Sequence, residues 1–143
     1  MKNFSELLAT DLELDFKLEM APFDSALDVG VWLNGQLAYD DLLTKDFEYS
    51  AQLSLLNPIS IRICVQGKDY ALDSQSAVLI KSIRIDDFDL IPNWTQLSSY
   101  TNDHNYTDPT THLGFNGEWQ YNIPEPFYQW KHKITGQGWL LTP

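Results

Sequence analysis

Residues 11–20 alternate strictly between charged and apolar side chains, and no other pattern limits the fold of this chain more. The apolar members are Leu12, Leu14, Phe16, Leu18 and Met20, and the charged members are Asp11, Glu13, Asp15, Lys17 and Glu19. A period of two places the two kinds of side chain on opposite faces of a strand, whereas a helix would scatter both around its axis. The segment is therefore predicted to be a β-strand with one buried face.

A hairpin is predicted where Asn34-Gly35 separates two apolar-rich segments, residues 28–33 and 36–39. Both turn residues tolerate the positive φ angles that a two-residue type I′ connection requires. The same dipeptide recurs at Asn116-Gly117, and it predicts a second hairpin over residues 115–123.

Alternation and turn residues predict further strands along the rest of the chain. These strands cover residues 47–55, 59–66, 78–85, 127–133 and 139–141, and a single helical turn is expected over residues 5–9. Within residues 78–85 the apolar positions change phase, which predicts a β-bulge near Lys81-Ser82 or burial of both faces. Residues 93–109 are polar and aperiodic, and they are predicted to form a long surface loop.

These elements predict an all-β fold. About eight short strands with frequent turn residues and no convincing amphipathic helix are typical of an antiparallel β-sandwich or jelly roll. We find no internal repeat and no linker, so one β-sandwich domain is expected over residues 1–143. With 43% hydrophobic and 20% charged residues, the chain does not have the composition of a disordered protein.

The chain is strongly acidic, with 20 acidic and 9 basic side chains and a net charge of −11 at pH 7. Because this charge repels phosphate, we do not expect DNA or RNA as a ligand. Residues 1–50 hold 11 of the acidic side chains and 3 basic ones. We interpret them as solvated strand faces, and the alternative is an acidic inhibitor that docks a basic host protein.

The only cysteine, Cys64, permits no intramolecular disulfide and supplies no thiolate metal cluster. The first residues reach acidic positions before any apolar run of signal-peptide length, so synthesis in the cytoplasm is expected. The longest apolar stretches have about five residues, against roughly 20 for a membrane helix. No membrane segment is therefore predicted.

Aromatic side chains concentrate in residues 94–143, which hold 10 of the 19 in the chain. A flat ring can cover the apolar C–H face of a sugar while neighbouring amides and carboxylates bind its hydroxyls. We therefore expect some of these rings to point outward and bind a glycan, the alternative being that they fill the core. The candidate ligand-binding residues are Trp94, Tyr100, Tyr106, Trp119, Tyr121 and Trp130.

Two segments, residues 86–89 and 102–108, contain the oxygen ligands that calcium prefers. The second lacks the turn glycine and the bidentate glutamate of an EF-hand, and such Asn/Asp-rich loops are commonly turns. An iron site that joins Asp108 to histidines lacks the His-x-Asp spacing of double-stranded β-helix oxygenases. The three histidines are His104, His112 and His132. No metal and no other cofactor is predicted.

The sequence shows no catalytic motif. Glu118 and Glu125 have no spacing that defines a glycosidase pair, and we find no Ser-His-Asp arrangement or phosphate-binding glycine loop. The chain is therefore predicted not to be an enzyme.

Two resemblances indicate what such a domain does. β-Sandwich carbohydrate-binding modules have a hairpin and sheet pattern that resembles Asp28-Val29-Gly30-Val31-Trp32-Leu33-Asn34-Gly35-Gln36 and the strands up to Ile85. This resemblance implies a non-catalytic glycan-binding surface. Small β proteins of tailed bacteriophages resemble the same pattern together with the ending Gly136-Gln137-Gly138-Trp139-Leu140-Leu141. That resemblance implies a virion component, such as a tail-fibre, baseplate or capsid decoration protein, that makes protein–protein contacts.

The first expectation is thus a non-enzymatic recognition module for glycans. A structural protein of a virion is the alternative, and an acidic inhibitor of a host protein is the third hypothesis. The oligomeric state stays open at this point.

Overall fold

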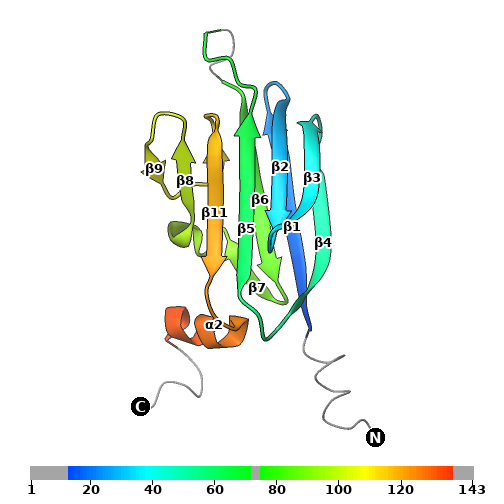
Figure 1. Ribbon diagram of the computed structural model, residues 1–143, viewed down its shortest axis with the longest axis vertical. Helices are drawn as coiled ribbons and strands as arrows, with labels where there is room; N and C mark the ends of the chain where they lie inside the picture. Colours follow the sequence, from blue (N-terminus) through cyan, green and yellow to red (C-terminus); the bar gives the residue numbers. More distant parts are fainter. Residues whose placement is uncertain (1–12, 72–74, 137–143) are drawn as a thin grey trace, which may run out of the picture.

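The computed structural model describes residues 13–71 and 75–136, which form two antiparallel sheets packed face to face (Figure 1). The strands are β1 (Glu13–Phe23), β2 (Leu27–Leu33), β3 (Gln36–Leu43), β4 (Phe47–Ser54), β5 (Ile59–Gln66), β6 (Ala77–Ile85), β7 (Phe88–Ile91), β8 (Ser99–Asn102), β9 (Thr107–Asp108), β10 (His112–Leu113) and β11 (Gly117–Ile123). A short 3-10 helix, η1 (Thr95–Leu97), and an α-helix, α2 (Phe127–Thr135), complete the described elements. The predicted all-β sandwich is confirmed.

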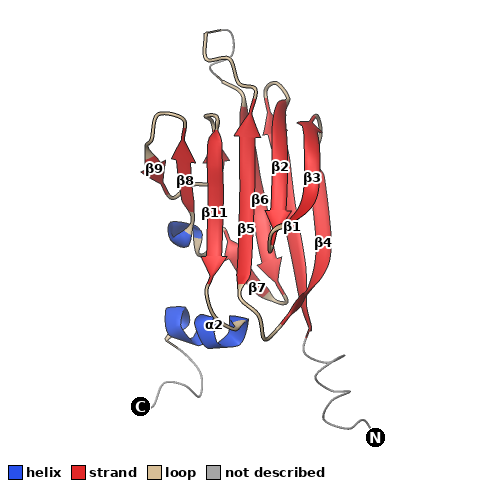
Figure 2. Ribbon diagram, in the orientation of Figure 1, coloured by secondary structure: helices blue, strands red, loops and turns tan. Residues whose placement is uncertain are grey.

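The strands divide into a five-stranded sheet and a six-stranded sheet. The first has the order β10-β6-β1-β4, with β7 also paired to β6, and the second has the order β3-β2-β5-β11-β8-β9. In Figure 1 the six-stranded sheet faces the viewer, with β3 and β9 at its two edges. Figure 2 shows that the described residues contain little helix.

The core lies between the sheets and consists of the inward rows of their strands. In β1, Leu14, Phe16, Leu18 and Met20 are buried, which confirms the face predicted from the alternation. The facing row from β5 is equally inaccessible and consists of Ile59, Ile61, Ile63 and Val65. Burial of each such side chain stabilises the fold by roughly 1.5–3 kcal/mol.

Two predicted irregularities of the backbone are confirmed. Asn34 and Gly35 connect β2 to β3 with φ angles of 52° and 80°, as a type I′ turn requires. Glu19 pairs with Ser82 while Met20 pairs with Ile80, so the residue between these partners is left without one. That residue is the predicted β-bulge in β6.

The second predicted hairpin, at Asn116-Gly117, is wrong. The strand before it, β10, belongs to the five-stranded sheet, whereas β11 lies in the six-stranded sheet, so the dipeptide crosses between sheets. A Cβ at Gly117 would lie 2.4 Å from the carbonyl oxygen of Thr101. Glycine is therefore needed here for the close approach of β8 rather than for a hairpin turn.

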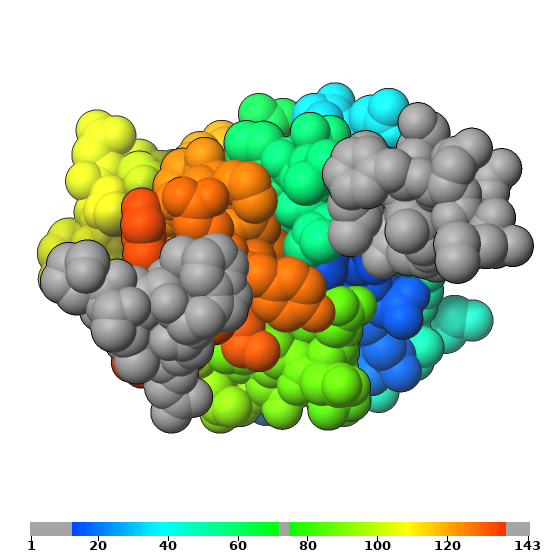
Figure 3. Space-filling model, turned by 90° about the horizontal axis from the view of Figure 1, so that it is seen from below, coloured from blue at the N-terminus to red at the C-terminus, as the bar shows by residue number. Residues whose placement is uncertain are grey.

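Residues 127–133 form a helix rather than the predicted strand. Phe127 and Trp130, three residues apart, share the buried face of α2. Pro126 precedes the helix, and Gly136, with φ of 66°, ends it in the left-handed conformation. Seen from below in Figure 3, the orange and red atoms of α2 cover part of one end of the sandwich. The helix covers this end of the core with its one apolar face, which carries Phe127 and Trp130.

Residues 93–109 are not the continuous loop that the sequence predicts, because they contain η1, β8 and β9. β8 buries only Tyr100, so its sequence shows no alternation to detect. The expected helical turn over residues 5–9, the start of the first strand at residues 11–12 and the strand over residues 139–141 lie outside the described residues. No helix among the described residues is long and apolar enough to cross a membrane.

Candidate functional site

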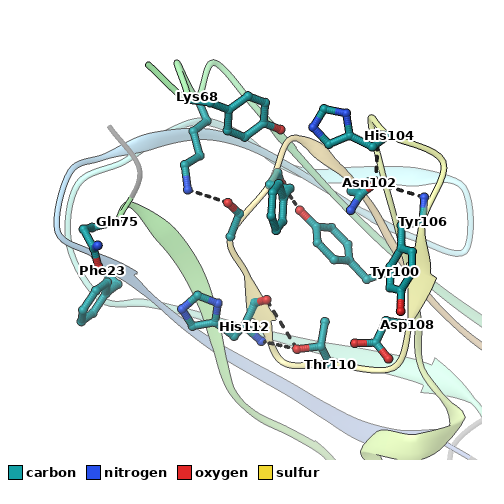
Figure 4. Close-up of a pocket in the computed structure, with 13 residues that line it drawn as sticks. Phe23, Lys68, Gln75, Tyr100, Asn102, His104, Tyr106, Asp108, Thr110 and His112 are labelled. Atoms are coloured by element: carbon teal, nitrogen blue, oxygen red, sulfur yellow. Dashed lines mark hydrogen bonds between the residues drawn. The ribbon is translucent and has the colours of Figure 1, made fainter. Parts of the chain in front are cut away.

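A pocket with a volume of about 750 Å³ lies between the two sheets, near the ends of β1 and β8 (Figure 4). The five-stranded sheet contributes Phe23 and His112, and the six-stranded sheet contributes Tyr100, Asn102 and Asp108. The remaining lining residues come from connecting segments and are Lys68, Tyr70, Gln75, His104, Tyr106, Thr110, Gly114 and Phe115. We call this cavity the inter-sheet pocket.

Three exposed aromatic rings line the inter-sheet pocket. Tyr106 is the most open, with 68% of its surface exposed, followed by Phe23 at 46% and Phe115 at 44%. Figure 4 shows Phe23 and Tyr106 on opposite sides of the pocket. Exposed rings of this size on separate segments make the lining apolar without closing it to solvent.

One wall of the pocket is fixed by a buried amine. Lys68 donates from Nζ to the carbonyl oxygens of Ser76, 2.7 Å away, and Gly114, 2.5 Å away. The Nδ2 group of Asn116 donates to the carbonyl oxygen of Lys68, and its Oδ1 accepts from the backbone N–H of the same residue, both over 2.9 Å. A buried polar group that loses its hydrogen bond costs folding free energy. These hydrogen bonds therefore keep the three chain segments that carry Lys68, Ser76 and Gly114–Asn116 together.

Tyr70 links this wall to the loop after β8. Its hydroxyl donates to Oδ1 of Asp103 over 2.8 Å and accepts from the backbone N–H of Asn116 over 2.9 Å. Burial, and then the hydrogen bond to Asp103, raises the pKa of the Tyr70 hydroxyl. Its ring centre lies 5.7 Å from those of Phe115 and His104, so the three rings form one cluster at the rim.

The loop that carries Tyr106 is ordered by the side chain of Asn102. Oδ1 of Asn102 accepts from the backbone N–H groups of His104, over 2.9 Å, and Tyr106, over 3.1 Å. Asn105 adopts a positive φ of 63°, which the local hydrogen bonds of such a turn favour. The sequence thereby presents the Tyr106 ring on a tight turn rather than on a long flexible loop.

Tyr100 forms part of the floor. Its ring is buried, and its hydroxyl donates to the carbonyl oxygen of Phe115. Burial raises the pKa of this phenol well above its ordinary value, so it stays neutral as a donor. The hydrogen bond fixes the backbone next to the exposed Phe115 ring.

The structure brings two of the predicted binding residues, Tyr100 and Tyr106, together in the pocket. Of these, Tyr106 points outward as expected. Trp94 is half-buried outside the pocket, where its ring stacks on that of Phe88 with centroids 6.3 Å apart.

The expected outward placement is wrong for Trp119, Tyr121 and Trp130, all of which are buried. Trp119 and Tyr121 lie on the inward face of β11, opposite the buried isoleucines of β5. Nε1 of Trp119 donates a hydrogen bond to the carbonyl oxygen of Thr110 over 2.9 Å. The hydroxyl of Tyr121 donates to the carbonyl oxygen of Trp94 over the same distance. These three rings build the core and offer no face to a ligand.

Sequence reasoning missed Phe23, Tyr70 and Phe115. Phe23 is the last residue of β1 and lies beyond the alternating row, which ends at Met20, and the other two lie outside the described strands. These residues come together only through the pairing of distant strands. No local pattern identifies them.

In each of the two segments with calcium-type ligands, one side chain uses its oxygen atoms within the protein. Asp86 accepts from the backbone N–H of Asp15 over 2.8 Å and from the hydroxyl of Tyr128 over 2.9 Å. In the other segment, Asn102 orders its own loop as described above. Within residues 13–71 and 75–136, no three His, Cys, Asp or Glu side chains are grouped so that they could hold a metal.

No protein-family model and no curated protein matches the sequence. The fold is similar to that of solved structures of a carbohydrate-binding module, vCBM60. One is vCBM60 in complex with galactobiose, which is 15% identical, with a TM-score of 0.53, over 76% of this chain and 99% of that chain.

A second similar structure is the selenomethionine form of vCBM60. It is 15% identical, with a TM-score of 0.53, over 77% of this chain and 92% of that chain. It is described with a circular permutation that links two families of calcium-dependent carbohydrate-binding modules. These likenesses establish a shared fold and support the resemblance to carbohydrate-binding sandwiches. They give no support to the resemblance to bacteriophage proteins.

Proposed function

We propose that this chain is a non-catalytic carbohydrate-binding module that holds a glycan in the inter-sheet pocket. One observation carries the proposal, namely the three exposed rings of Phe23, Tyr106 and Phe115 around a cavity that also contains polar side chains. The cavity volume of about 750 Å³ falls within the range of roughly 300–1,000 Å³ typical of small-molecule sites.

The polar groups of the pocket suit sugar hydroxyls. The carboxylate of Asp108 and the Nδ2 group of Asn102 form no hydrogen bond with other described residues, so an acceptor and a donor are available to a ligand. A sugar hydroxyl both donates and accepts, while the C–H face of the ring packs on an aromatic side chain. The proposed ligand is therefore a glycan.

The small number of carboxylates that line the inter-sheet pocket agrees with a site that binds a glycan without hydrolysing it. Asp108 is the only carboxylate among the described residues that line the pocket. Glycosidases commonly use two carboxylates roughly 5–9.5 Å apart, one of which protonates the leaving group. The galactobiose complex of vCBM60 supports the choice of a neutral glycan as the first ligand to test.

The proposal is tested by a glycan array followed by calorimetric titration with galactobiose, in buffer that contains calcium because the similar modules belong to calcium-dependent families. Tyr106→Ala and Phe115→Ala should each lower the affinity roughly two- to tenfold, as expected for one lost aromatic contact. Tyr128→Ala removes an exposed ring on α2, outside the pocket, and should leave binding unchanged. Failure of the wild-type chain to bind any glycan on the array would overturn the proposal.

A further inference from the structure

The outer face of the six-stranded sheet carries a row of side chains that crosses four strands. Trp32 of β2 pairs with Arg62 of β5, Arg62 pairs with Gln120 of β11, and Gln120 pairs with Ser99 of β8. These residues alternate with the buried residues of their strands, so their side chains lie on the face away from the core. Three strand spacings give this row a length of roughly 14 Å.

Two hollows lie along this face. One, of about 480 Å³, is lined by side chains of β5, β11 and β8 that include Thr101, Glu118 and Gln120. The other, of about 230 Å³, is lined by Trp32, Arg62 and neighbouring residues. Asn102 lines both the larger hollow and the inter-sheet pocket. The inter-sheet pocket therefore adjoins the larger hollow at β8, and the smaller hollow lies farther along the sheet, at β5 and β2.

The indole of Trp32 lies at the far end of the row. A Cβ at Gly30 would fall 2.6 Å from two ring carbons of Trp32, so glycine at this position lets the indole lie over the strand. The guanidinium carbon of Arg62 is 4.3 Å from the centre of the indole ring. Trp32 is half-buried, and its N–H has no acceptor among the residues that the structure describes.

The middle of the row offers donors and acceptors side by side. Nε of Arg62 is 3.7 Å from Oε1 of Glu118, and Nε2 of Gln120 donates to the same oxygen over 2.6 Å. Nε of Arg62 is buried without a hydrogen bond, and its two Nη groups also form none with other described residues. Adjacent donors and acceptors match the hydroxyls of a sugar, and the net charge of −11 favours a neutral chain over an anionic one.

We propose that this outer face is a second carbohydrate-binding surface, which takes the chain of a neutral oligosaccharide as it leaves the inter-sheet pocket past Asn102 toward Trp32. The inference rests on the proposed function, because it extends the ligand of that pocket. A disaccharide fills the pocket only, whereas a longer chain also contacts the outer face. Affinity should therefore rise with chain length.

The test is calorimetric titration with galactobiose and with galactohexaose of the same linkage. The wild-type chain should bind the hexaose at least about fivefold more tightly than the disaccharide, since additional subsites on one chain add to the affinity. Trp32→Ala should remove this gain and leave galactobiose binding unchanged, whereas Phe115→Ala should weaken both ligands. Gln120→Ala changes an exposed side chain and should reduce the gain even if Trp32→Ala fails to fold. Tyr128→Ala serves as the matched control.

Equal affinities for the two sugars, or a gain that survives in both Trp32→Ala and Gln120→Ala, would overturn this inference while leaving the proposed function intact. Absence of binding to both sugars would overturn galactobiose as a ligand of the pocket, and the outer surface with it. Tight hexaose binding that depends on Trp32 but is insensitive to Phe115→Ala would support the outer surface and contradict the role of the pocket.

Discussion

The ammonium group of Lys68 lies 2.5 Å from the carbonyl oxygen of Gly114, the residue just before the exposed ring of Phe115. This hydrogen bond joins the segment after β5 to the segment before β11. It therefore couples the stability of the sandwich to the shape of the inter-sheet pocket.

Lys68→Met should destabilise the protein by about 2–3 kcal/mol, because the carbonyl oxygens of Ser76 and Gly114 lose a charged donor. Urea unfolding followed by tryptophan fluorescence measures this change. Lys133→Met is the control, since this lysine forms an exposed ion pair with Glu125 that should contribute less than about 1 kcal/mol. Similar losses in the two variants would contradict the structural role of Lys68.

Trp119→Ala should cost about 3–5 kcal/mol of folding free energy, because it leaves a large cavity in the core. Tyr106→Ala removes a ring that is 68% exposed and should change the free energy of unfolding by less than about 0.5 kcal/mol. The same urea titration compares the two variants. A Trp119 variant as stable as the wild type would show that this ring is not buried.

Alkaline pH should destabilise the fold through its buried phenols. Burial raises the pKa of the Tyr121 hydroxyl in the folded chain above the ordinary value of 10.0. As the pH rises above 10, the unfolded chain therefore ionises first. The stability that is present below pH 10 is then lost. Tyr121→Phe cannot ionise, so the stability difference between wild type and variant should change in the variant's favour above pH 10. Urea unfolding from pH 8 to 11 measures this difference, and a constant difference would contradict the burial of the phenol.

The sequence predicts the sheets well wherever one face of a strand is buried. The alternation in β1 and β5 identifies their buried rows correctly, and Asn34-Gly35 identifies its turn. Prediction fails where tertiary contacts decide between local possibilities. The apolar side chains of residues 127–133 are compatible with a strand. The segment is a helix because Phe127 and Trp130, at helical spacing, both pack into the core at the end of the sandwich.

The site was harder to predict than the fold. Polar residues separate Trp119, Tyr121 and Ile123 in the sequence, which indicates that these three share one face of a strand. In the structure, that face is buried in the core. This signal argues for burial of the two rings. The rings that do line the pocket, such as Phe23 and Phe115, are far apart in the sequence and meet only because β1 and β11 lie in facing sheets.

Backbone amide chemical shifts during titration with galactobiose test the central claim most directly, because they report where the ligand binds. We expect saturable changes concentrated at pocket residues such as His104, Tyr106 and Phe115, and these changes should be strongly reduced in the Phe115→Ala variant. No saturable change with galactobiose or with the strongest ligand from the glycan array, or changes confined to residues outside the inter-sheet pocket such as those of α2, would contradict the account.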